Sequence, residues 1–315
     1  MVATTDGANT VILRAFLANL GIAVAKFAGA AITGSSAMMT EGVHSLVDTV
    51  NEALLAYGRR RARLPADELH PLGYAREQYF WSFVVALLVF TLGAGVALYE
   101  GVAHWLHPVE TERPAVALGI LGIAALLEGW SLVAAVRAFN RARGDLPFLR
   151  AVIDSRDTTT LSVMLEDAAA VCGLFIAASG IGLELLTRDP RWDALASILI
   201  AFLLGVVAII LLAKAKHLLI GQTASPEIAR ALRAIAAAQP GVTAVVEVLT
   251  IQQSVDAVLA VMRVDFDDGI EGAQVERIVG DIARDAQKRL PAVSRLFVSP
   301  FDTRRAASQT GRQQD

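Results

Sequence analysis

Long apolar blocks in the first two thirds of the chain constrain its fold more than any other feature. A membrane-spanning helix needs about 20 mostly apolar residues, and six stretches before residue 219 are of about that length. They cover residues 11–33, 37–57, 80–99, 114–138, 161–186 and 194–213. Because a backbone inside a bilayer must satisfy its own hydrogen bonds, we expect helices here. The sequence therefore predicts an all-α, six-helix transmembrane domain over residues 11–220.

Positive charges are distributed unevenly between the connecting loops. The loops after the second and fourth predicted helices, and the residues after the sixth, hold most of the arginines and lysines of this region. The opposite loops carry only Arg113, Arg188 and Arg191. Since positively charged loops stay in the cytoplasm, we predict a multi-pass protein of the cell (inner) membrane with both termini cytoplasmic.

The remainder of the chain has the composition of a soluble domain. Ser225-Pro226-Glu227 is typical of a helix start, and residues 271–289 carry apolar side chains at helical spacing. Predicted strands cover residues 242–251, 257–266 and 293–298. This αββαβ order predicts a small cytoplasmic α+β domain of the ferredoxin-like or metallochaperone-like kind, with its helices on one face of the sheet.

We assign residues 221–300 to this second domain, for dimerisation or regulation, and expect a disordered tail over residues 301–315. No histidine follows His217, and the single cysteine, Cys172, lies in the membrane region. The domain therefore has only carboxylates as potential ligands, and these bind zinc weakly. We expect it to bind no zinc tightly and to dimerise through apolar surface.

Charge and composition exclude several classes of protein. The net charge of −3 gives no basic excess that would attract nucleic acid. Hydrophobic residues make up 55% of the chain and charged residues 19%, against about 45–50% and 25% in soluble domains. These figures exclude a disordered, collagen-like or disulfide-stapled chain. We therefore expect the protein to lie in the lipid bilayer.

Four ionisable residues and an asparagine interrupt the second apolar stretch, although an ionisable side chain in hydrocarbon costs at least about 2.5–3.5 kcal/mol. At 3.6 residues per turn they lie on one stripe of the helix. They are Glu41, His44, Asp48, Asn51 and Glu52. His44 and Asp48 are four residues apart, so their imidazole and carboxylate meet on one face and can share a divalent cation.

The fifth predicted helix adds Glu166 and Asp167 within an apolar run. Asp48 and Asp167 each lie near the middle of helices that run in opposite directions, so they can face each other at similar depth. His44, Asp48 and Asp167 would then supply one nitrogen and two oxygens. That set suits a borderline cation such as zinc.

These groups could instead pair with one another and hold helices together. Lys26 in the first helix and Glu128 in the fourth are the candidates for this role, either as a structural ion pair or as proton-coupled groups beside a cation site. For His44, Asp48 and Asp167 the ligand interpretation is favoured, because no cation of the protein stands beside them to offset both carboxylates.

The ordered set of motifs resembles the cation diffusion facilitator family. It comprises the six helices, then His44-Ser45-Leu46-Val47-Asp48, the loop His70-Pro71-Leu72-Gly73-Tyr74, and Leu218-Leu219-Ile220-Gly221 before Ser225-Pro226-Glu227. A single HxxxD motif is weak, but the set covers nearly the whole chain. The resemblance implies a homodimeric antiporter that exports a divalent metal ion, usually zinc, in exchange for protons.

The family's transport site has two positions four residues apart on the second helix and two on the fifth. By resemblance these are His44 and Asp48, then Val163 and Asp167. Val163 departs from the family pattern, because valine is no metal ligand. The segment 164–167 resembles the branch that includes the ninth human-type zinc transporter, where Glu166 or Asn51 would supply the missing ligand. Glu166 and Asp167 point about 100° apart, so both cannot aim squarely at one ion without distortion.

Some family members bind a second metal ion between the second and third helices, and Asp67 and His70 match two of those positions. The third position is Tyr74, whose protonated phenol is a poor ligand. The same residues would also suit a turn that enters the third helix. The loop therefore has a structural interpretation and a metal-binding one.

Several functions remain open at this point. An exporter of iron, cobalt or manganese would use similar ligands, and a membrane-bound metal sensor or scaffold would bind an ion without transporting it. An intramembrane metalloenzyme ranks last, since the chain has no zinc-protease motif or serine nucleophile elbow. We predict a transporter rather than an enzyme, with no prosthetic cofactor and with the metal ion as substrate.

Overall fold

The computed structural model describes residues 5–302, and the side chains of residues 19–302 except Ala142. The chain divides into two compact units, Met1–Lys216 and His217–Asp315. Most of the predicted tail, residues 303–315, lies outside the described residues.

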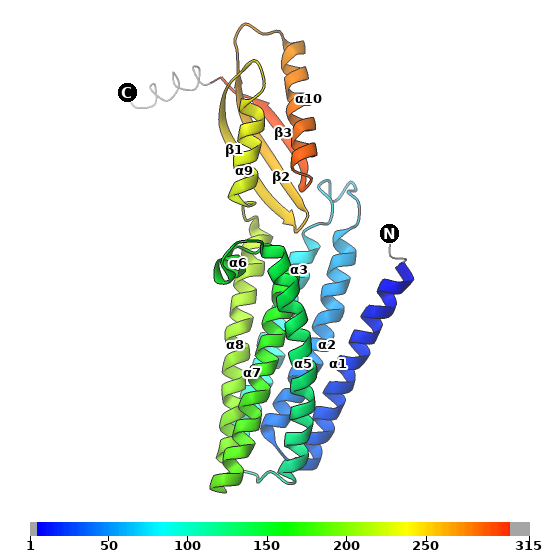
Figure 1. The fold of residues 1–315 in the computed structure, drawn as a ribbon, viewed down its shortest axis with the longest axis vertical. Helices are drawn as coiled ribbons and strands as arrows, with labels where there is room; N and C mark the ends of the chain where they lie inside the picture. Colours follow the sequence, from blue (N-terminus) through cyan, green and yellow to red (C-terminus); the bar gives the residue numbers. More distant parts are fainter. Residues whose placement is uncertain (1–4, 303–315) are drawn as a thin grey trace, which may run out of the picture. The chain divides into compact units, whose positions relative to one another are not determined.

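The first unit is helical, and its long helices lie side by side in one bundle (Figure 1). Its elements are α1 (Thr5–Thr33), α2 (Ser36–Ala62), α3 (Glu77–Leu88), η1 (Val89–Ala94), α4 (Gly95–Leu106), α5 (Pro114–Arg143), α6 (Phe148–Asp154), α7 (Thr158–Thr187) and α8 (Arg191–Ile220). The segments α3, η1 and α4 are continuous, and η1 is a single π-helical stretch within them. The predicted helical transmembrane region is confirmed.

Four helical segments of the described chain are long and apolar enough to cross a membrane. They are Glu77–Leu106, Pro114–Arg141, Thr158–Thr187 and Arg191–Ile220. The part of α1 whose side chains are described, Asn19–Thr33, is apolar but shorter. α2 is less apolar, because it carries the polar stripe and ends in several arginines, although its length of 27 residues is sufficient to span a bilayer.

The helices extend beyond the apolar stretches that predict them. α2 continues through Arg59, Arg60 and Arg61 to Ala62, because charged residues are good helix formers once the chain leaves the apolar region. The short helix α6 was not predicted. It packs through Phe148, whose ring lies edge-on to that of Phe139 at 5.5 Å, and through the buried Ala151.

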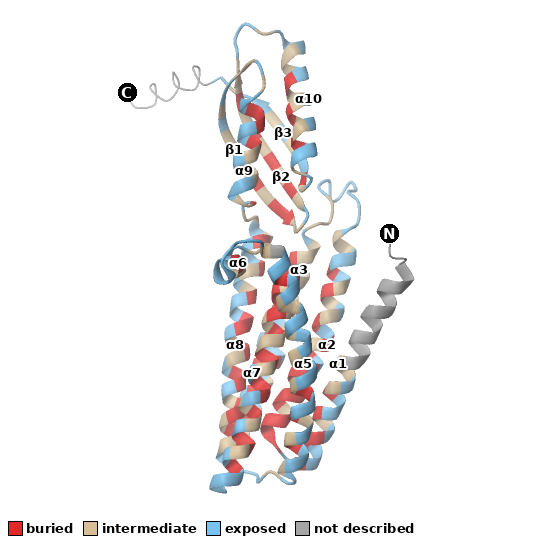
Figure 2. Cartoon of the chain, viewed as in Figure 1, coloured by how far each residue is buried: buried red, intermediate tan, exposed pale blue. Residues whose placement is uncertain are grey.

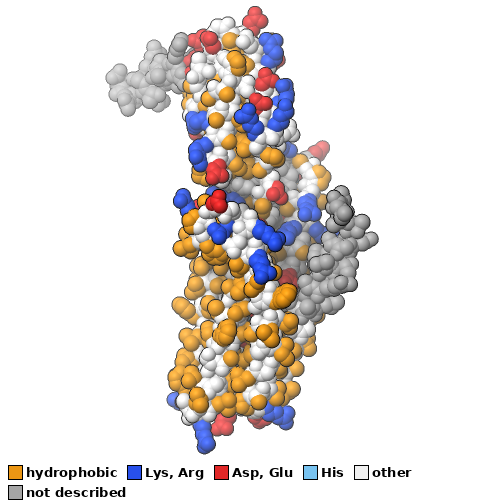
Figure 3. Space-filling model, viewed as in Figure 1, with side chains coloured by type: hydrophobic (Ala, Val, Ile, Leu, Met, Phe, Trp, Pro, Cys, Tyr) orange, Lys and Arg blue, Asp and Glu red, His pale blue; other side chains and the backbone are white. Residues whose placement is uncertain are grey.

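Buried residues concentrate where the helices face one another, and the outward faces are exposed (Figure 2). On the face drawn in Figure 3, hydrophobic side chains cover most of the helical unit, and lysine and arginine gather near its ends. An apolar belt between charged ends is the surface expected of a protein that sits in a bilayer.

The second unit has the order αββαβ that the sequence predicts. Its elements are α9 (Pro226–Ala237), β1 (Val242–Ser254), β2 (Ala257–Phe266), α10 (Gly272–Arg289) and β3 (Val293–Pro300). The strands form one sheet in the order β1-β2-β3. β1 pairs with β2 in antiparallel register, and β2 pairs with β3 in parallel. The parallel pair requires a crossover, which α10 provides.

One face of this sheet carries the core of the unit. Alternate residues of β2, such as Ala260 and Met262, are fully buried. They pack in one cluster with Leu232 of α9 and Ile282 of α10. The predicted α+β arrangement, with both helices on one face, is therefore confirmed.

Candidate functional site

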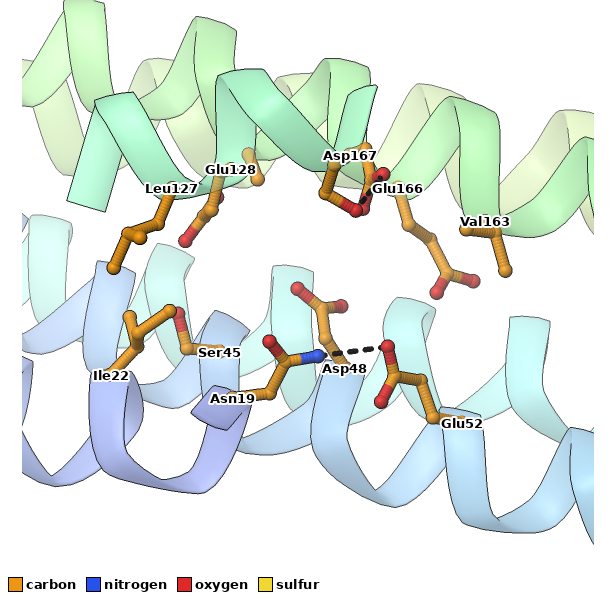
Figure 4. A pocket seen from close by; sticks show the side chains of 12 residues that line it. Asn19, Ile22, Ser45, Asp48, Glu52, Leu127, Glu128, Val163, Glu166 and Asp167 are labelled. Carbon is orange, nitrogen blue, oxygen red and sulfur yellow. Dashed lines mark hydrogen bonds between the residues drawn. The ribbon is translucent and has the colours of Figure 1, made fainter. Parts of the chain in front are cut away.

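A cavity of about 210 Å³ opens between four helices of the first unit. Its lining residues come from α1, α2, α5 and α7, and polar groups predominate at its centre (Figure 4). The residues are Asn19, Ile22, Ser45, Asp48, Glu52, Leu127, Glu128, Ser131, Val163, Glu166, Asp167 and Ala170. The structure thus brings Asp48, Glu166 and Asp167 to one cavity, as the sequence predicts.

The carboxylates of α2 and α7 point toward each other across this cavity (Figure 4). An Oδ atom of Asp167 accepts a hydrogen bond of 2.7 Å from the hydroxyl of Ser131 on α5. Glu166 is only 5% exposed, and one of its oxygens lies 3.5 Å from the amide nitrogen of Asn51. The other Glu166 oxygen and Oδ1 of Asp48 are buried without a hydrogen-bond partner.

His44 lies one turn from Asp48 on α2 and is 1% exposed. Its Nδ1 is 3.5 Å from Oδ1 of Asp48, which confirms that the two side chains meet. Both ring nitrogens lack a hydrogen-bond partner. The imidazole does not line the cavity but adjoins Asp48, which does.

Asn51 is oriented toward Glu166 rather than toward the cavity. Its amide group is the donor to Glu166, and its Oδ1 atom is buried without a partner. Val163 also lines the cavity but offers no ligand atom. Of the two substitutes that the sequence suggests for Val163, Glu166 is the one that faces the cavity.

The described side chains do not, as they stand, bring three His, Cys, Asp or Glu residues to one point that could hold a metal ion. The carboxylates of the cavity are instead spread over opposite walls (Figure 4). Coordination at about 2.0–2.2 Å therefore requires these side chains to converge.

Lys26 of α1 forms a buried ion network beside the cavity. It is fully buried, and its ammonium group lies 2.7 Å from an oxygen of Glu128 and 3.1 Å from an oxygen of Glu41. It also donates to the hydroxyl of Ser45 at 2.7 Å. The predicted pairing of Lys26 with Glu128 is present, and Glu41 is an additional partner.

Six carboxyl groups lie in or beside the cavity, and among the described residues Lys26 is the one lysine or arginine paired with any of them. They belong to Glu41, Asp48, Glu52, Glu128, Glu166 and Asp167. Two unit charges 4 Å apart interact by about 4 kcal/mol at an effective dielectric constant of 20. Mutual repulsion within the cluster therefore favours bound protons or a bound cation.

The loop between α2 and α3 arranges its predicted residues as a turn. One oxygen of Asp67 accepts a 2.7 Å hydrogen bond from the backbone N–H of His70, and the other accepts one of 2.7 Å from the hydroxyl of Tyr74. These bonds, that of Tyr74 foremost, lower the pKa of Asp67 from its ordinary value. Arg61 lies over the ring of Tyr74 at 5.2 Å. Asp67 thus already has donors, which supports the structural interpretation of the loop.

Sequence reasoning missed two polar residues that line the cavity. Asn19 of α1 donates a 2.8 Å hydrogen bond to Glu52, and Ser131 of α5 holds Asp167. A polar residue inside an apolar helix is the signal that identified Lys26, and it would have identified Asn19 as well. A serine is tolerated in membrane helices, so Ser131 carries no comparable signal.

The comparisons with known proteins agree with this fold. The cation efflux transmembrane domain family matches residues 12–220, which is more than half of the chain. The chain therefore belongs to the cation efflux family of membrane transporters.

Several relatives have been named in other organisms. The chain is 37% identical over 238 residues to the mitochondrial proton-coupled zinc antiporter SLC30A9 of Xenopus laevis, covering 75% of this chain and 42% of that protein. It is 36% identical over 192 residues to metal tolerance protein C4 of Arabidopsis thaliana, covering 60% and 42%. Magnetosome protein MamB of Magnetospirillum gryphiswaldense is 26% identical over 236 residues, covering 75% and 74%. The chain spans about two fifths of the length of the first two relatives.

Proposed function

We propose that the chain exports a divalent cation, zinc foremost, in exchange for protons, through the cavity between α2, α5 and α7. The observation that carries this proposal is a set of buried carboxylate oxygens without hydrogen-bond donors, on Asp48, Glu128 and Glu166. A buried charged group that lacks partners is costly unless a cation or a proton compensates it. The relatives named as proton-coupled zinc antiporters support the choice of zinc.

Asp48, Asp167 and His44 are the proposed metal ligands. Asp48 and Asp167 face the cavity from opposite helices (Figure 4), and His44 adjoins Asp48 at 3.5 Å. One imidazole nitrogen and two carboxylates form a set typical of zinc. Glu166 is the proposed replacement for the ligand that Val163 cannot supply. The side-chain amide of Asn51 donates to one of its oxygens at 3.5 Å.

Proton exchange follows from the same ligands. A metal ion binds the neutral imidazole and the ionised carboxylates, so its arrival displaces protons and its departure lets them return. With Lys26 as the paired lysine among the described residues, an empty cavity needs protons to offset its negative charge. The cavity thus holds either a metal ion or protons, which couples the two flows in opposite directions.

The orientation in the membrane and the dimer are part of the proposal. We propose that both termini lie in the cytoplasm, because the basic loops flank α2 and α5 at their C-terminal ends. A periplasmic reporter fused after Gln222 should be inactive, and one placed near Val109 should be active.

Chemical cross-linking in the membrane tests the proposed homodimer, and recovery of monomer alone would contradict it.

Zinc uptake into proteoliposomes under a pH gradient tests the function. The purified chain should take up zinc only when the gradient is present, and should move protons in the opposite direction. Asp48→Asn or Asp167→Asn should lower uptake at least about 100-fold, because each removes a charged ligand while it keeps the shape of the side chain. Parallel assays with iron, cobalt and manganese decide the metal.

Asp67→Asn is the matched control, since it makes the same change in the loop between α2 and α3. It should leave uptake within about twofold of the unchanged chain. Absence of zinc uptake by the unchanged chain, with tight zinc binding retained, would favour a metal sensor or scaffold instead. Normal uptake by Asp48→Asn would show that the cavity is not part of the transport path.

A further inference from the structure

Glu128 of α5 belongs to the cavity although it lies on neither of the helices that the proposed ligands occupy. Its side chain lines the cavity and points into the space that Asp48 and Asp167 also face (Figure 4). Ser131 lies three residues further along α5 and holds Asp167 at 2.7 Å. Residues three apart share a helix face, so Glu128 and Asp167 are neighbours across the contact between α5 and α7.

The two oxygens of Glu128 have different surroundings. One lies 2.7 Å from the ammonium group of Lys26, and the other is buried without a hydrogen-bond partner. The unpartnered oxygen needs a cation or a proton that Lys26 does not supply. An independent observation points to a ligand in the same place, since the buried Glu166 of α7, on the same side of the cavity as Glu128 (Figure 4), also has an oxygen without a partner.

Glu41 shows what a purely structural partner of Lys26 looks like. It lies 3.1 Å from the same ammonium group and is fully buried, but it does not line the cavity. Its free oxygen is also buried without a hydrogen-bond partner, but it packs against α7 at Gly173, away from the cavity, where it leaves no room for an added Cβ. Lys26 therefore has one partner that faces the cavity and one that faces packed helix.

We propose that Glu128 is a further ligand for the transported cation, supplied by α5. The inference rests on the proposed function of the cavity. When the cavity is empty, Lys26 holds the Glu128 carboxylate at the wall. When a divalent cation enters, Glu128 turns its free oxygen to the ion beside Asp167, and Lys26 keeps Glu41 as its counter-ion. Glu128 thereby adds an oxygen from a third helix to those that α2 and α7 supply.

Zinc binding to the purified full chain, measured by titration calorimetry with zinc chloride, tests this assignment. Glu128→Gln should raise the dissociation constant for zinc at least about tenfold and raise the KM of uptake by a similar factor. The substitution keeps an oxygen that accepts from Lys26 and leaves Lys26 with Glu41 as an equal counter-charge, so the fold should persist. The matched control is Glu184→Gln, which makes the same change at a buried glutamate outside the cavity, held by Thr111, and should alter both constants by no more than about twofold.

The outcomes separate this inference from the function on which it rests. An unchanged zinc affinity in Glu128→Gln, with binding lost in Asp48→Asn, would overturn the role of Glu128 and leave the transport site standing. Equal effects of Glu128→Gln and Glu184→Gln would also overturn it, because the loss of any buried glutamate charge would then suffice. If Glu128→Gln does not fold, Glu128→Asp keeps the charge beside Lys26 but shortens the reach of the carboxylate, and a rise in the dissociation constant is still expected. A failure of the unchanged chain to transport any metal would instead defeat the proposed function.

Discussion

Two groups of buried carboxylates in the helical unit differ in what surrounds them. At the end where α2 begins, Asp193 accepts hydrogen bonds of 2.6 Å from the hydroxyl of Ser35 and from the backbone N–H of Ser36. Glu184 accepts bonds of 2.7 and 2.6 Å from the backbone and the hydroxyl of Thr111. In the cavity, by contrast, Asp48 and Glu166 each keep a buried oxygen without a donor.

The difference separates a structural carboxylate from a ligand. Asp193 places its negative charge on the first N–H groups of α2, where a helix end favours an anion, so its charge is already satisfied. Within the part of the chain that the structure describes, no helix N-terminus faces the carboxylates of the cavity, and too few hydroxyl groups lie near them to donate a hydrogen bond to every oxygen. They depend on something that the chain does not provide, and a cation fits that need.

Removing Asp193 should cost the most stability. Asp193→Ala leaves two serine hydroxyls and the N–H of Ser36 without their acceptor, and each lost bond to a charged group contributes about 1.5–3 kcal/mol. We expect the free energy of unfolding in detergent to fall by about 3 kcal/mol or more. Asp48→Asn, which removes an uncompensated charge, should leave this free energy unchanged or raise it. A loss of stability in Asp48→Asn as large as that in Asp193→Ala would contradict the distinction between structural carboxylates and ligands.

Within the cavity, the two positions of α7 should differ in zinc uptake. Glu166→Gln removes a charge that faces the cavity and should lower uptake about tenfold. Val163→Ala removes only methyl groups from the same wall and should change uptake by no more than about twofold. Proteoliposome assays measure both. The reverse order of effects would reject Glu166 as the replacement ligand.

The α/β unit extends the comparison to carboxylates exposed to water. Its acidic residues include Asp267, which holds its own turn by accepting from the N–H of Gly269. No histidine lies beyond His217. We expect a fragment of residues 225–300 to fold without metal and to show no micromolar or tighter zinc binding in calorimetry. Tight binding, or a dimer that a chelator separates, would contradict this expectation.

The smallest effect concerns the loop between α2 and α3. Since Tyr74 is the largest cause of the lowered pKa of Asp67, Tyr74→Phe should raise that pKa toward its ordinary value of about 3.9. A carboxyl whose pKa is lowered in the folded state stabilises the fold above its ordinary pKa, and this contribution is lost as the pH falls through the lowered value. The turn should therefore persist at neutral pH and loosen only in acid. A carbon-13 NMR titration of Asp67 measures the shift, and an unchanged pKa in Tyr74→Phe would contradict the hydrogen bond as its cause.

Much of this architecture was predictable from the sequence because two patterns carry it. Apolar length predicts the membrane helices, and the β-branched, partly alternating run of residues 257–266 predicts a strand. The structure shows that Val258, Ala260, Met262 and Val264 form its buried face. Helix ends were less predictable. Hydropathy marks where the apolar environment ends, whereas α2 continues for more than a turn through Arg59, Arg60 and Arg61.

The candidate site was predictable only in part. Periodicity along α2 places His44 and Asp48 on one face, and their contact at 3.5 Å confirms that step. Contacts between helices have no periodic signal within a single sequence. The partnership of Lys26 with both Glu41 and Glu128, and that of Ser131 with Asp167, depend on how α1, α2, α5 and α7 pack. Hence the sequence identifies the ionisable residues but not which of them already have donors.

Anomalous X-ray diffraction at the zinc edge, on crystals of the zinc-loaded chain, tests most directly whether the donor-poor cavity is the cation site. We predict one strong anomalous peak inside the cavity, about 2.0–2.2 Å from carboxylate oxygens of Asp48 and Asp167, and none in crystals of Asp48→Asn. A peak bound only by Asp67 and His70, with the cavity empty, would contradict the assignment.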